Sequence, residues 1–286
     1  MKRERDIAEM VRPRDPRSIE ESTSPRQAAR TRRGPLPADN REAVRVRQLP
    51  FNGPTLYRPE FERDNCGFGL IAHMDGQPSH WLLETAISAL ARLTHRGAVA
   101  ADGKSGDGCG LLIKPPVAFL RRTAAAEGIE LADHFATGCV FLSQDADTAG
   151  HARSVLEEAL AHYEVTAAGW REVPVDISAC GKQALATLPA IDQVFVNAPN
   201  GMDEAEFERR LFMARRRAEK ALDGNDEDFY IPSLSGRVLS YKGLVMPENL
   251  PVFYKDLQDP GLETSLAVFH QRFSTNTLPQ WRLAQP

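Results

Sequence analysis

The sequence has few cysteines, and it lacks the spacings that would make them structural. Its four cysteines, at positions 66, 109, 139 and 180, form no C-x2-C pair or other paired pattern. A disulfide framework or a zinc site needs such patterns, so we expect a reduced chain without a bound metal. No apolar run reaches the ~18 residues of a membrane span, and the charged N-terminus has no apolar signal segment. These absences favour a cytoplasmic protein without a membrane segment.

Positive charge is also scarce in the part of the chain that can fold. The sequence carries 35 Lys and Arg against 39 Asp and Glu, a formal charge of −4. Residues 1–65 hold 15 basic and 11 acidic residues (+4), which leaves 20 basic and 28 acidic residues (−8) for the remainder. An acidic globular part argues against nucleic-acid binding. The 42% hydrophobic content suffices for one large domain or two small ones.

The first 59 residues are rich in Arg, Pro and Glu and poor in large apolar side chains. Prolines interrupt any helix there, and the segment cannot bury enough apolar surface to offset the entropy cost of ordering. We therefore expect a disordered leader over residues 1–65. A basic arm that binds nucleic acid is the weaker alternative, because acidic residues are interleaved with the arginines.

The candidate for a catalytic nucleophile lies in the stretch 62–72 (ERDNCGFGLIA). On a strand, alternation places Cys66 and Phe68 on one face and Gly67 and Gly69 on the other, where the glycines would leave room for a ligand. Our hypothesis is that cleavage makes Cys66 the N-terminal residue and the nucleophile. Its α-amine, which titrates near pH ~8, could then take the proton of a thiol near ~8.5. The alternative is a buried structural cysteine.

Three further motifs follow this stretch in a fixed order. The four motifs are CGFGLIA (66–72), HRGA (95–98), ADGKSGDG (101–108) and HQRFSTNT (270–277). Together they resemble the start of the large subunit of bacterial glutamate synthases, class II glutamine amidotransferases of the N-terminal-nucleophile type. The resemblance runs from about residue 60 to the last residue. It implies a pro-segment over residues 1–65 and an amidotransferase domain over residues 66–286.

The resemblance also implies a reaction and a set of site residues. L-glutamine would lose ammonia through a γ-glutamyl thioester on Cys66, and the ammonia would serve glutamate formation from 2-oxoglutarate. The residues that match the family are Cys66 as nucleophile, Arg272, Thr275 and Asn276 in the glutamine pocket, and Arg96 and Gly97 as structural support of the active site. A guanidinium grips a carboxylate with two parallel bonds, as the α-carboxylate of glutamine would require. A strand-end surface arginine is the alternative for Arg272.

The pattern of apolar residues predicts alternating helices and strands. The expected helices cover 79–95, with Ser79 as N-cap and Gly97 at C′, and 203–222, with Asp203 as cap. The expected strands cover 66–72, 111–113, 137–142, 169–175, 192–197 and 266–273, with a mobile turn over 102–110 and a hairpin over 228–241. The pattern supports α/β or α+β. The resemblance implies α+β, the αββα sandwich of N-terminal-nucleophile hydrolases, incomplete at its C-terminus.

Cofactors and partners are expected only from the resemblance. It implies no cofactor in this chain, whereas the full-length family uses FMN, an iron–sulfur cluster, and NADPH through a small partner subunit. It also implies an Asn-Gly oxyanion element and an amine-binding aspartate downstream of Pro286. We therefore expect a truncated portion that is nearly inert as a glutaminase by itself and that needs the missing synthase regions. We also expect the strand ending at Arg272 to lack a neighbour in the sheet.

Three alternatives stay open at this point. The chain could belong to another class II amidotransferase, such as the asparagine or glucosamine phosphate enzymes. It could be an ordinary cysteine–histidine hydrolase in which Cys66 stays uncleaved and His95 or His270 is the base. It could also be a non-enzymatic remnant that binds a partner subunit.

Overall fold

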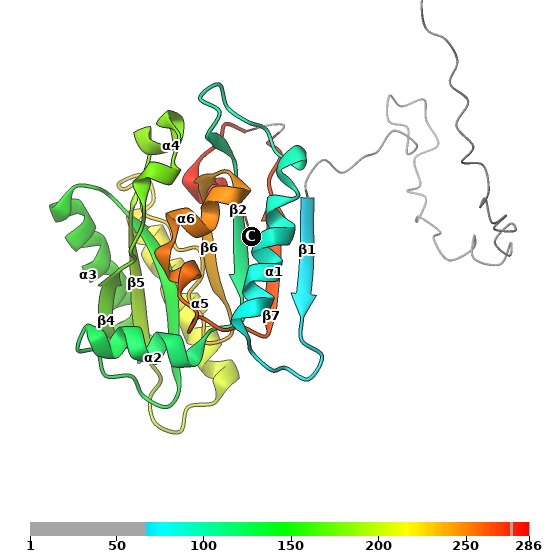
Figure 1. The fold of residues 1–286 in the computed structure, drawn as a ribbon. Helices are drawn as coiled ribbons and strands as arrows, with labels where there is room; N and C mark the ends of the chain where they lie inside the picture. The colour runs from blue at the N-terminus through cyan, green and yellow to red at the C-terminus, as the bar shows by residue number, and fades with distance from the viewer. Residues whose placement is uncertain (1–66, 275–276, 286) are drawn as a thin grey trace, which may run out of the picture. The chain divides into compact units, whose positions relative to one another are not determined.

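Seven strands form two antiparallel sheets in the computed structural model, which describes residues 67–274 and 277–285 (Figure 1). The first sheet has the order β1-β7-β2-β6, and the second has the order β3-β5-β4. The first sheet contains β1 (Gly67–Ala72), β2 (Ser105–Ile113), β6 (Leu239–Val245) and β7 (Leu266–Gln271). The second contains β3 (Phe135–Leu142), β4 (Thr166–Glu172) and β5 (Ala190–Asn197). The fold is therefore mixed α/β, as the sequence pattern predicts.

Helices cover both sides of this strand layer. They are α1 (His80–Ala91), α2 (Val117–Ala126), α3 (Ala146–His162), α4 (Lys182–Ala186), α5 (Glu204–Leu222) and α6 (Leu250–Phe253). Figure 1 shows α1, α2 and α6 on one side, with α3 and α5 on the other. Among the described residues, no helix is long and apolar enough to span a membrane.

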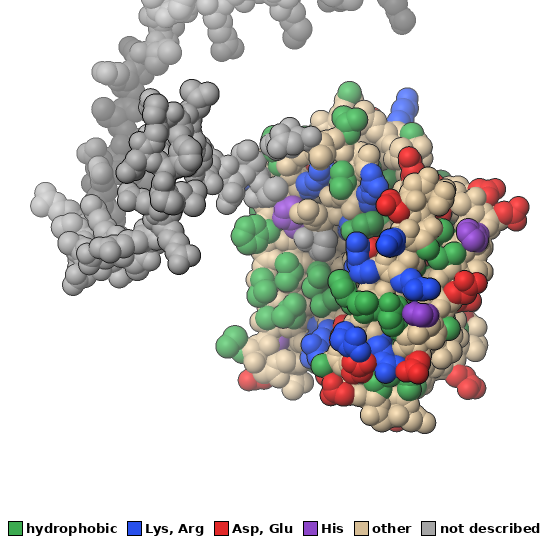
Figure 2. All heavy atoms as spheres, turned by 180° about the vertical axis from the view of Figure 1, so that it is seen from behind, with side chains coloured by type: hydrophobic (Ala, Val, Ile, Leu, Met, Phe, Trp, Pro, Cys, Tyr) green, Lys and Arg blue, Asp and Glu red, His purple; other side chains and the backbone are tan. Residues whose placement is uncertain are grey.

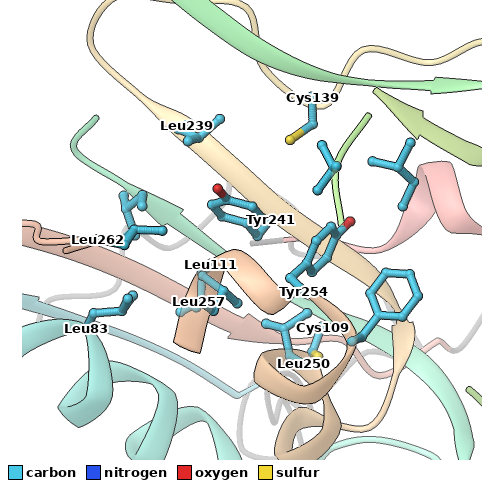
Figure 3. Packing of buried hydrophobic residues seen from close by; sticks show 14 of the residues in the cluster. Leu83, Cys109, Leu111, Cys139, Leu239, Tyr241, Leu250, Tyr254, Leu257 and Leu262 are labelled. Atoms are coloured by element: carbon cyan, nitrogen blue, oxygen red, sulfur yellow. The ribbon is translucent and has the colours of Figure 1, made fainter. Parts of the chain in front are cut away.

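Two apolar cores hold these layers together. The first joins one face of both sheets to α1, α2 and α6; Figure 3 shows Leu83, Leu111, Cys139 and Tyr241 packed within it. The second lies between α3, α5 and the opposite face of β3 and β5. Strands β3 and β5 contribute alternate residues to both cores, so both of their faces are buried.

The two sheets are linked at their edges. Thr137 and Phe141 of β3 form bridges with Ser235 and Tyr230, and the N–H of Ser240 in β6 donates to Ser233 Oγ at 3.0 Å. The segment between residues 230 and 235 therefore runs between β3 and β6. The hairpin expected over 228–241 is wrong, because this segment satisfies its backbone groups on β3 instead of on itself.

Strand β7 lies inside its sheet, between β1 and β2. The expectation that the strand ending at Arg272 lacks a neighbour is therefore wrong. Strand β1 is one of the two edge strands of this sheet, and its outer face carries Phe68 at 73% and Leu70 at 62% exposure. Figure 2, a view from behind, shows hydrophobic side chains gathered on this side. No helix therefore covers the outer face of β1 among the described residues.

The two predicted helices begin at their predicted caps. Ser79 Oγ accepts the N–H of Leu82 at 3.2 Å, and Asp203 accepts the N–H groups of Ala205 and Glu206. The first helix ends earlier than expected, at Ala91, and a short 3-10 turn, η3 (Thr94–Arg96), follows.

Candidate active site

Three strands of the first sheet meet at one end, where the predicted motifs converge. In the antiparallel register, Gly67 of β1 is opposite Gln271 of β7, and Gln271 is opposite Cys109 of β2. Directly opposed residues in such a ladder have Cα atoms about 4.5–5.5 Å apart. The start of β1, the end of β7 and the body of β2 therefore form one side-by-side group, and Arg272 follows directly after β7.

The η3 turn packs on this strand end from the helix side. A Cβ atom placed on Gly67 would lie 3.1 Å from Cβ of Arg96, so the stem of this arginine covers the first residue of β1. A Cβ on Gly69 would lie 2.4 Å from the Phe269 ring. The two glycines of the CGFG motif thus make room for neighbouring side chains of the protein, not for a ligand as the sequence suggested.

Gly97 is needed for close packing rather than for its backbone angle. Its φ of −111° and ψ of 160° are extended, so the left-handed C′ conformation expected there is wrong. A Cβ at this position would lie 1.9 Å from Nε2 of Gln271. Gln271 is fully buried, and its Nε2 donates to the carbonyl of Arg272 at 3.3 Å. Gly97 therefore lets the Gln271 side chain reach the start of the loop that follows β7.

Arg272 is half-buried and held by its neighbours. Its backbone N–H donates to the carbonyl of Gly108 at 2.9 Å, and its Nη1 donates to the carbonyl of Asp107 at 3.4 Å. Its Nη2 donates to Thr277 Oγ1. The guanidinium is therefore fixed close to the end of β7 and the start of β1.

The segment 102–110 is not the mobile turn that the sequence analysis expected. Residues from Ser105 onward belong to β2 and are buried, and only the first part forms a turn. Asp102 accepts the N–H groups of Lys104, Ser105 and Gln183 and the hydroxyl of Ser105, and these hydrogen bonds lower the pKa of its carboxyl. The turn is thereby tied to the start of α4.

Two residues at this strand end, Asp107 and Gln271, were not picked out from the sequence. Both lie inside the recognised motifs, Asp107 at the seventh position of ADGKSGDG and Gln271 at the second position of HQRFSTNT. Both are buried polar side chains, at 5% and 0% exposure. Buried polar groups need hydrogen-bond partners. A polar residue within a glycine-rich motif beside a predicted strand was therefore the sequence feature that could have identified Asp107 and Gln271.

The two histidines considered as alternative bases differ in their surroundings. His95 is exposed, and its Nδ1 contacts the carbonyl of Arg92 at 3.0 Å. His270 is half-buried in β7 opposite Phe68, and its Nδ1 is buried without a hydrogen-bond partner among the described residues. Burial lowers the pKa of His270, as does the nearby charge of Arg272, against a raising contribution from the backbone of Gln285. The imidazole of His270 is therefore kept neutral.

The three described cysteines are buried and unreactive in character. Burial raises the pKa of Cys109, raises that of Cys139 to about 12 and raises that of Cys180 to about 11. A thiol is a nucleophile or metal ligand only as the thiolate. In residues 67–274 and 277–285, no group of three or more His, Cys, Asp or Glu side chains is arranged to hold a metal ion.

Three of the predicted site residues, Cys66, Thr275 and Asn276, lie outside the described residues. The other three are brought to the same strand end. Arg96 and Gly97 pack against Gly67 and Gln271, and Arg272 continues from Gln271. Arg272 lies 175 positions after Gly97 in the sequence, and the β1–β7 pairing brings the two together.

The described residues form a mixed α/β domain with two antiparallel sheets, and the predicted motifs collect at one strand end of the first sheet. The family model of class-II glutamine amidotransferases matches residues 66–286. The chain belongs to this family.

The curated relatives that the chain matches are glutamate synthases. The chain is 43% identical over 235 residues to the glutamate synthase [NADPH] large chain of Azospirillum brasilense. It is 42% identical over 239 residues to ferredoxin-dependent glutamate synthase 2 of Synechocystis and 38% identical over 232 residues to the glutamate synthase [NADPH] large chain of Bacillus subtilis. These alignments cover 80%, 82% and 81% of the chain. The matched part is about 15% of the length of each relative.

Proposed function

We propose that the chain is the glutamine-hydrolysing part of a glutamate synthase. Cys66, freed at its N-terminus, attacks the side-chain amide of L-glutamine and forms a γ-glutamyl thioester, and its amine carries the proton to the departing ammonia. Water then releases glutamate from the thioester. The ammonia serves to form glutamate from 2-oxoglutarate. The family membership and the named relatives support this reading.

The observation that carries the proposal is the pairing of Gly67 with Gln271. Cys66 is bonded to Gly67, and Arg272 is bonded to Gln271. Consecutive Cα atoms are about 3.8 Å apart, so nucleophile and arginine both attach to the same pair of opposed residues. This arrangement suits an enzyme that grips the α-carboxylate of glutamine with Arg272 while a thiol attacks the other end. Thr275 and Asn276, three and four residues after Arg272, complete the proposed glutamine pocket.

The proposed architecture is the four-layer αββα sandwich, with residues 66–286 in the amidotransferase domain and residues 1–65 as a pro-segment. The outer face of β1 supports it, because Phe68 and Leu70 are exposed on a sheet whose other face is covered by helices. Burial of such an apolar face against a second sheet would remove it from water. Arg96 and Gly97 would then hold the start of β1 and Gln271 in place.

The FMN and iron–sulfur cluster that the resemblance implies are assigned to no residue described here. Cys109, Cys139 and Cys180 are buried thiols, and no three metal-binding side chains gather in the described ranges. A cluster is held by four thiolates, so this part of the chain does not fit one. The small subunit, the synthase regions and the cytoplasmic location stay part of the proposal.

A cysteine–histidine hydrolase is the second candidate, and His270 is the observation that favours it. A neutral imidazole in β7, one residue away from Gln271, is chemically able to act as a base. The two mechanisms differ in what they need. The first requires a free amine on Cys66, and the second does not.

The deciding experiment measures both the N-terminus and the glutaminase rate of the full-length gene product. We expect the active form to begin at Cys66 by intact mass, and Cys66→Ala to abolish ammonia release from glutamine. His270→Gln, the matched variant, should keep most of the rate. An active enzyme that still carries Asn65 would refute the proposed mechanism, and loss of activity in His270→Gln alone would favour the second candidate.

Arg272→Lys tests the glutamine clamp. An ammonium cannot reproduce the two parallel bonds of a guanidinium, so we expect KM for glutamine to rise by about tenfold or more. Glutamate formation from added free ammonia should be unchanged, because that route does not use the glutamine pocket. Unaltered glutamine kinetics would make Arg272 a structural residue of the strand end.

A further inference from the structure

The start of β2 contains an irregularity that has no role in the mechanism above. The β2–β6 register shifts between Ser105 and Cys109. Within this bulge Gly108 has a φ of +104°, a left-handed value that glycine adopts without strain. Bulges re-aim side chains and are frequent beside active sites. The bulge in β2 redirects the side chain of Asp107, which is only 5% exposed.

The bulge holds the segment that carries Arg272. Oδ2 of Asp107 accepts the N–H of Ser274 at 2.5 Å. The carbonyl of Asp107 accepts Nη1 of Arg272 at 3.4 Å, and the carbonyl of Gly108 accepts the N–H of Arg272 at 2.9 Å. Two adjacent residues of β2 therefore bind both the first and the third residue after β7, and one of these bonds is made by the guanidinium itself.

A carboxylate that accepts a backbone N–H makes a charge-assisted bond, which is stronger than a neutral one. Burial strengthens it further, because water competes less for the N–H. Ser274 is bound by this carboxylate on one side and by the carbonyl of Thr277 through its own hydroxyl on the other. The position of the Arg272 backbone thus depends on an anion that is 165 residues earlier in the sequence.

We propose that Asp107 is a positioning residue for glutamine binding. It fixes the backbone from Arg272 to Ser274. The guanidinium of Arg272 is therefore already in position when the α-carboxylate of glutamine binds. The inference rests on the proposed function of Arg272. The α-carboxylate of glutamine takes no part in the bond changes, so it is bound equally in the ground state and the transition state. Loss of Asp107 therefore raises KM and leaves kcat nearly unchanged.

The test compares Asp107→Ala and Asp107→Asn in the full-length gene product, with ammonia release from glutamine as the readout. Alanine removes the acceptor for Ser274, and we expect KM to rise about tenfold or more, as loss of a hydrogen bond to a charged group does. Asparagine is nearly the same size and keeps a neutral acceptor, so its KM should lie between those of wild type and Asp107→Ala. It also serves as the test if the alanine variant does not fold.

Asp102→Ala is the matched control. Asp102 lies in the same motif and accepts several hydrogen bonds, but its partners are Lys104, Ser105 and Gln183, and it accepts none from Arg272 or Ser274. We expect it to lower the unfolding temperature without changing KM.

An unchanged KM in folded Asp107→Ala, or in Asp107→Asn if alanine prevents folding, would overturn the proposal, and so would a fall in kcat at constant KM. Absence of glutaminase activity in wild type would instead overturn the proposed function, so the two failures are distinguishable.

Discussion

Strand β3 of the second sheet and strand β1 of the first sheet are buried to different extents. In the second sheet, β3 is buried along its whole length, because α3 and α5 cover one face and the first core covers the other. In the first sheet, β1 alternates between covered and exposed residues, and its outer face carries Phe68 at 73% exposure. Stability is therefore expected to depend more on β3 and the two cores that it joins than on β1, and glutamine chemistry on the end of the first sheet.

The strand end of the first sheet and helix α3 also use glycine differently. Gly150 lies in α3, and a Cβ there would meet nothing within 4 Å. Gly67, Gly69 and Gly97 in the first sheet and its η3 turn all have neighbours within 3.2 Å of such an atom. At the strand end, glycine is required by close packing. In the helix over the second sheet, nothing in the structure requires it.

The largest expected effect on stability comes from a matched pair of phenylalanines. Phe195 of β5 is fully buried in the first core, whereas Phe68 of β1 is exposed. Phe195→Ala should reduce the free energy of unfolding by about 3–5 kcal/mol, through lost burial and a cavity. Phe68→Ala should change it by only about 0.5 kcal/mol or less. Urea unfolding of both variants measures the difference, and a comparable loss in Phe68→Ala would mean that the outer face of β1 is buried in solution.

Two glycine-to-alanine substitutions should act in opposite directions. In Gly97→Ala the new Cβ displaces the buried Gln271 side chain, so we expect a loss of about 1–3 kcal/mol from overpacking. Gly150→Ala in α3 should instead gain about 0.5–1 kcal/mol, because alanine loses less backbone entropy in a helix. Thermal unfolding and glutaminase assays of both variants are the measurement. If Gly97→Ala unfolds at the wild-type temperature with full activity, close packing at the strand end is not required.

A third expected effect is a pH dependence from Lys242 of β6, which is 4% exposed and stacks on Tyr230. Burial, together with the charges of Arg215 and Arg272, lowers the pKa of Lys242 from 10.5 to about 7. The unfolded chain therefore binds more protons than the folded chain above pH 7, so stability should rise with pH. The expected gain is about 1–2 kcal/mol between pH 7 and pH 8.5.

Lys242→Met is the control for this prediction. It keeps the length of the side chain without the charge, so urea unfolding should show no comparable gain with pH. The window ends at pH 8.5 because the buried thiols act in the opposite direction above it. Burial raises the pKa of Cys139 to about 12, so the folded chain retains a proton that the unfolded chain loses. The same pH dependence in wild type and Lys242→Met would show that Lys242 is not the group responsible.

Local features of the fold could be predicted from the sequence. Ser79 and Asp203 cap their helices as expected, because an N-cap is decided by a few neighbouring residues. The inward positions of α5, such as Phe207 and Leu211, follow the helical period and are buried. The hairpin predicted over 228–241 is wrong, and the mobile turn predicted over 102–110 is wrong from Ser105 onward, because these segments pair with β3 and β6, which are distant in the sequence.

The sequence by itself determined the family, since four ordered motifs carry it, and it predicted Arg272 as the arginine that we propose to bind the glutamine carboxylate. Only the tertiary structure decided that Gly97 leaves room for the side chain of Gln271, and that Asp107 accepts a hydrogen bond from the N–H of Ser274. Composition and spacing show which chemical groups a chain contains, and hydrophobic periodicity shows on which face of a helix or strand they lie. Partners more than a hundred residues apart are set by strand register, which the β1–β7–β2 pairing establishes only when the whole sheet is assembled.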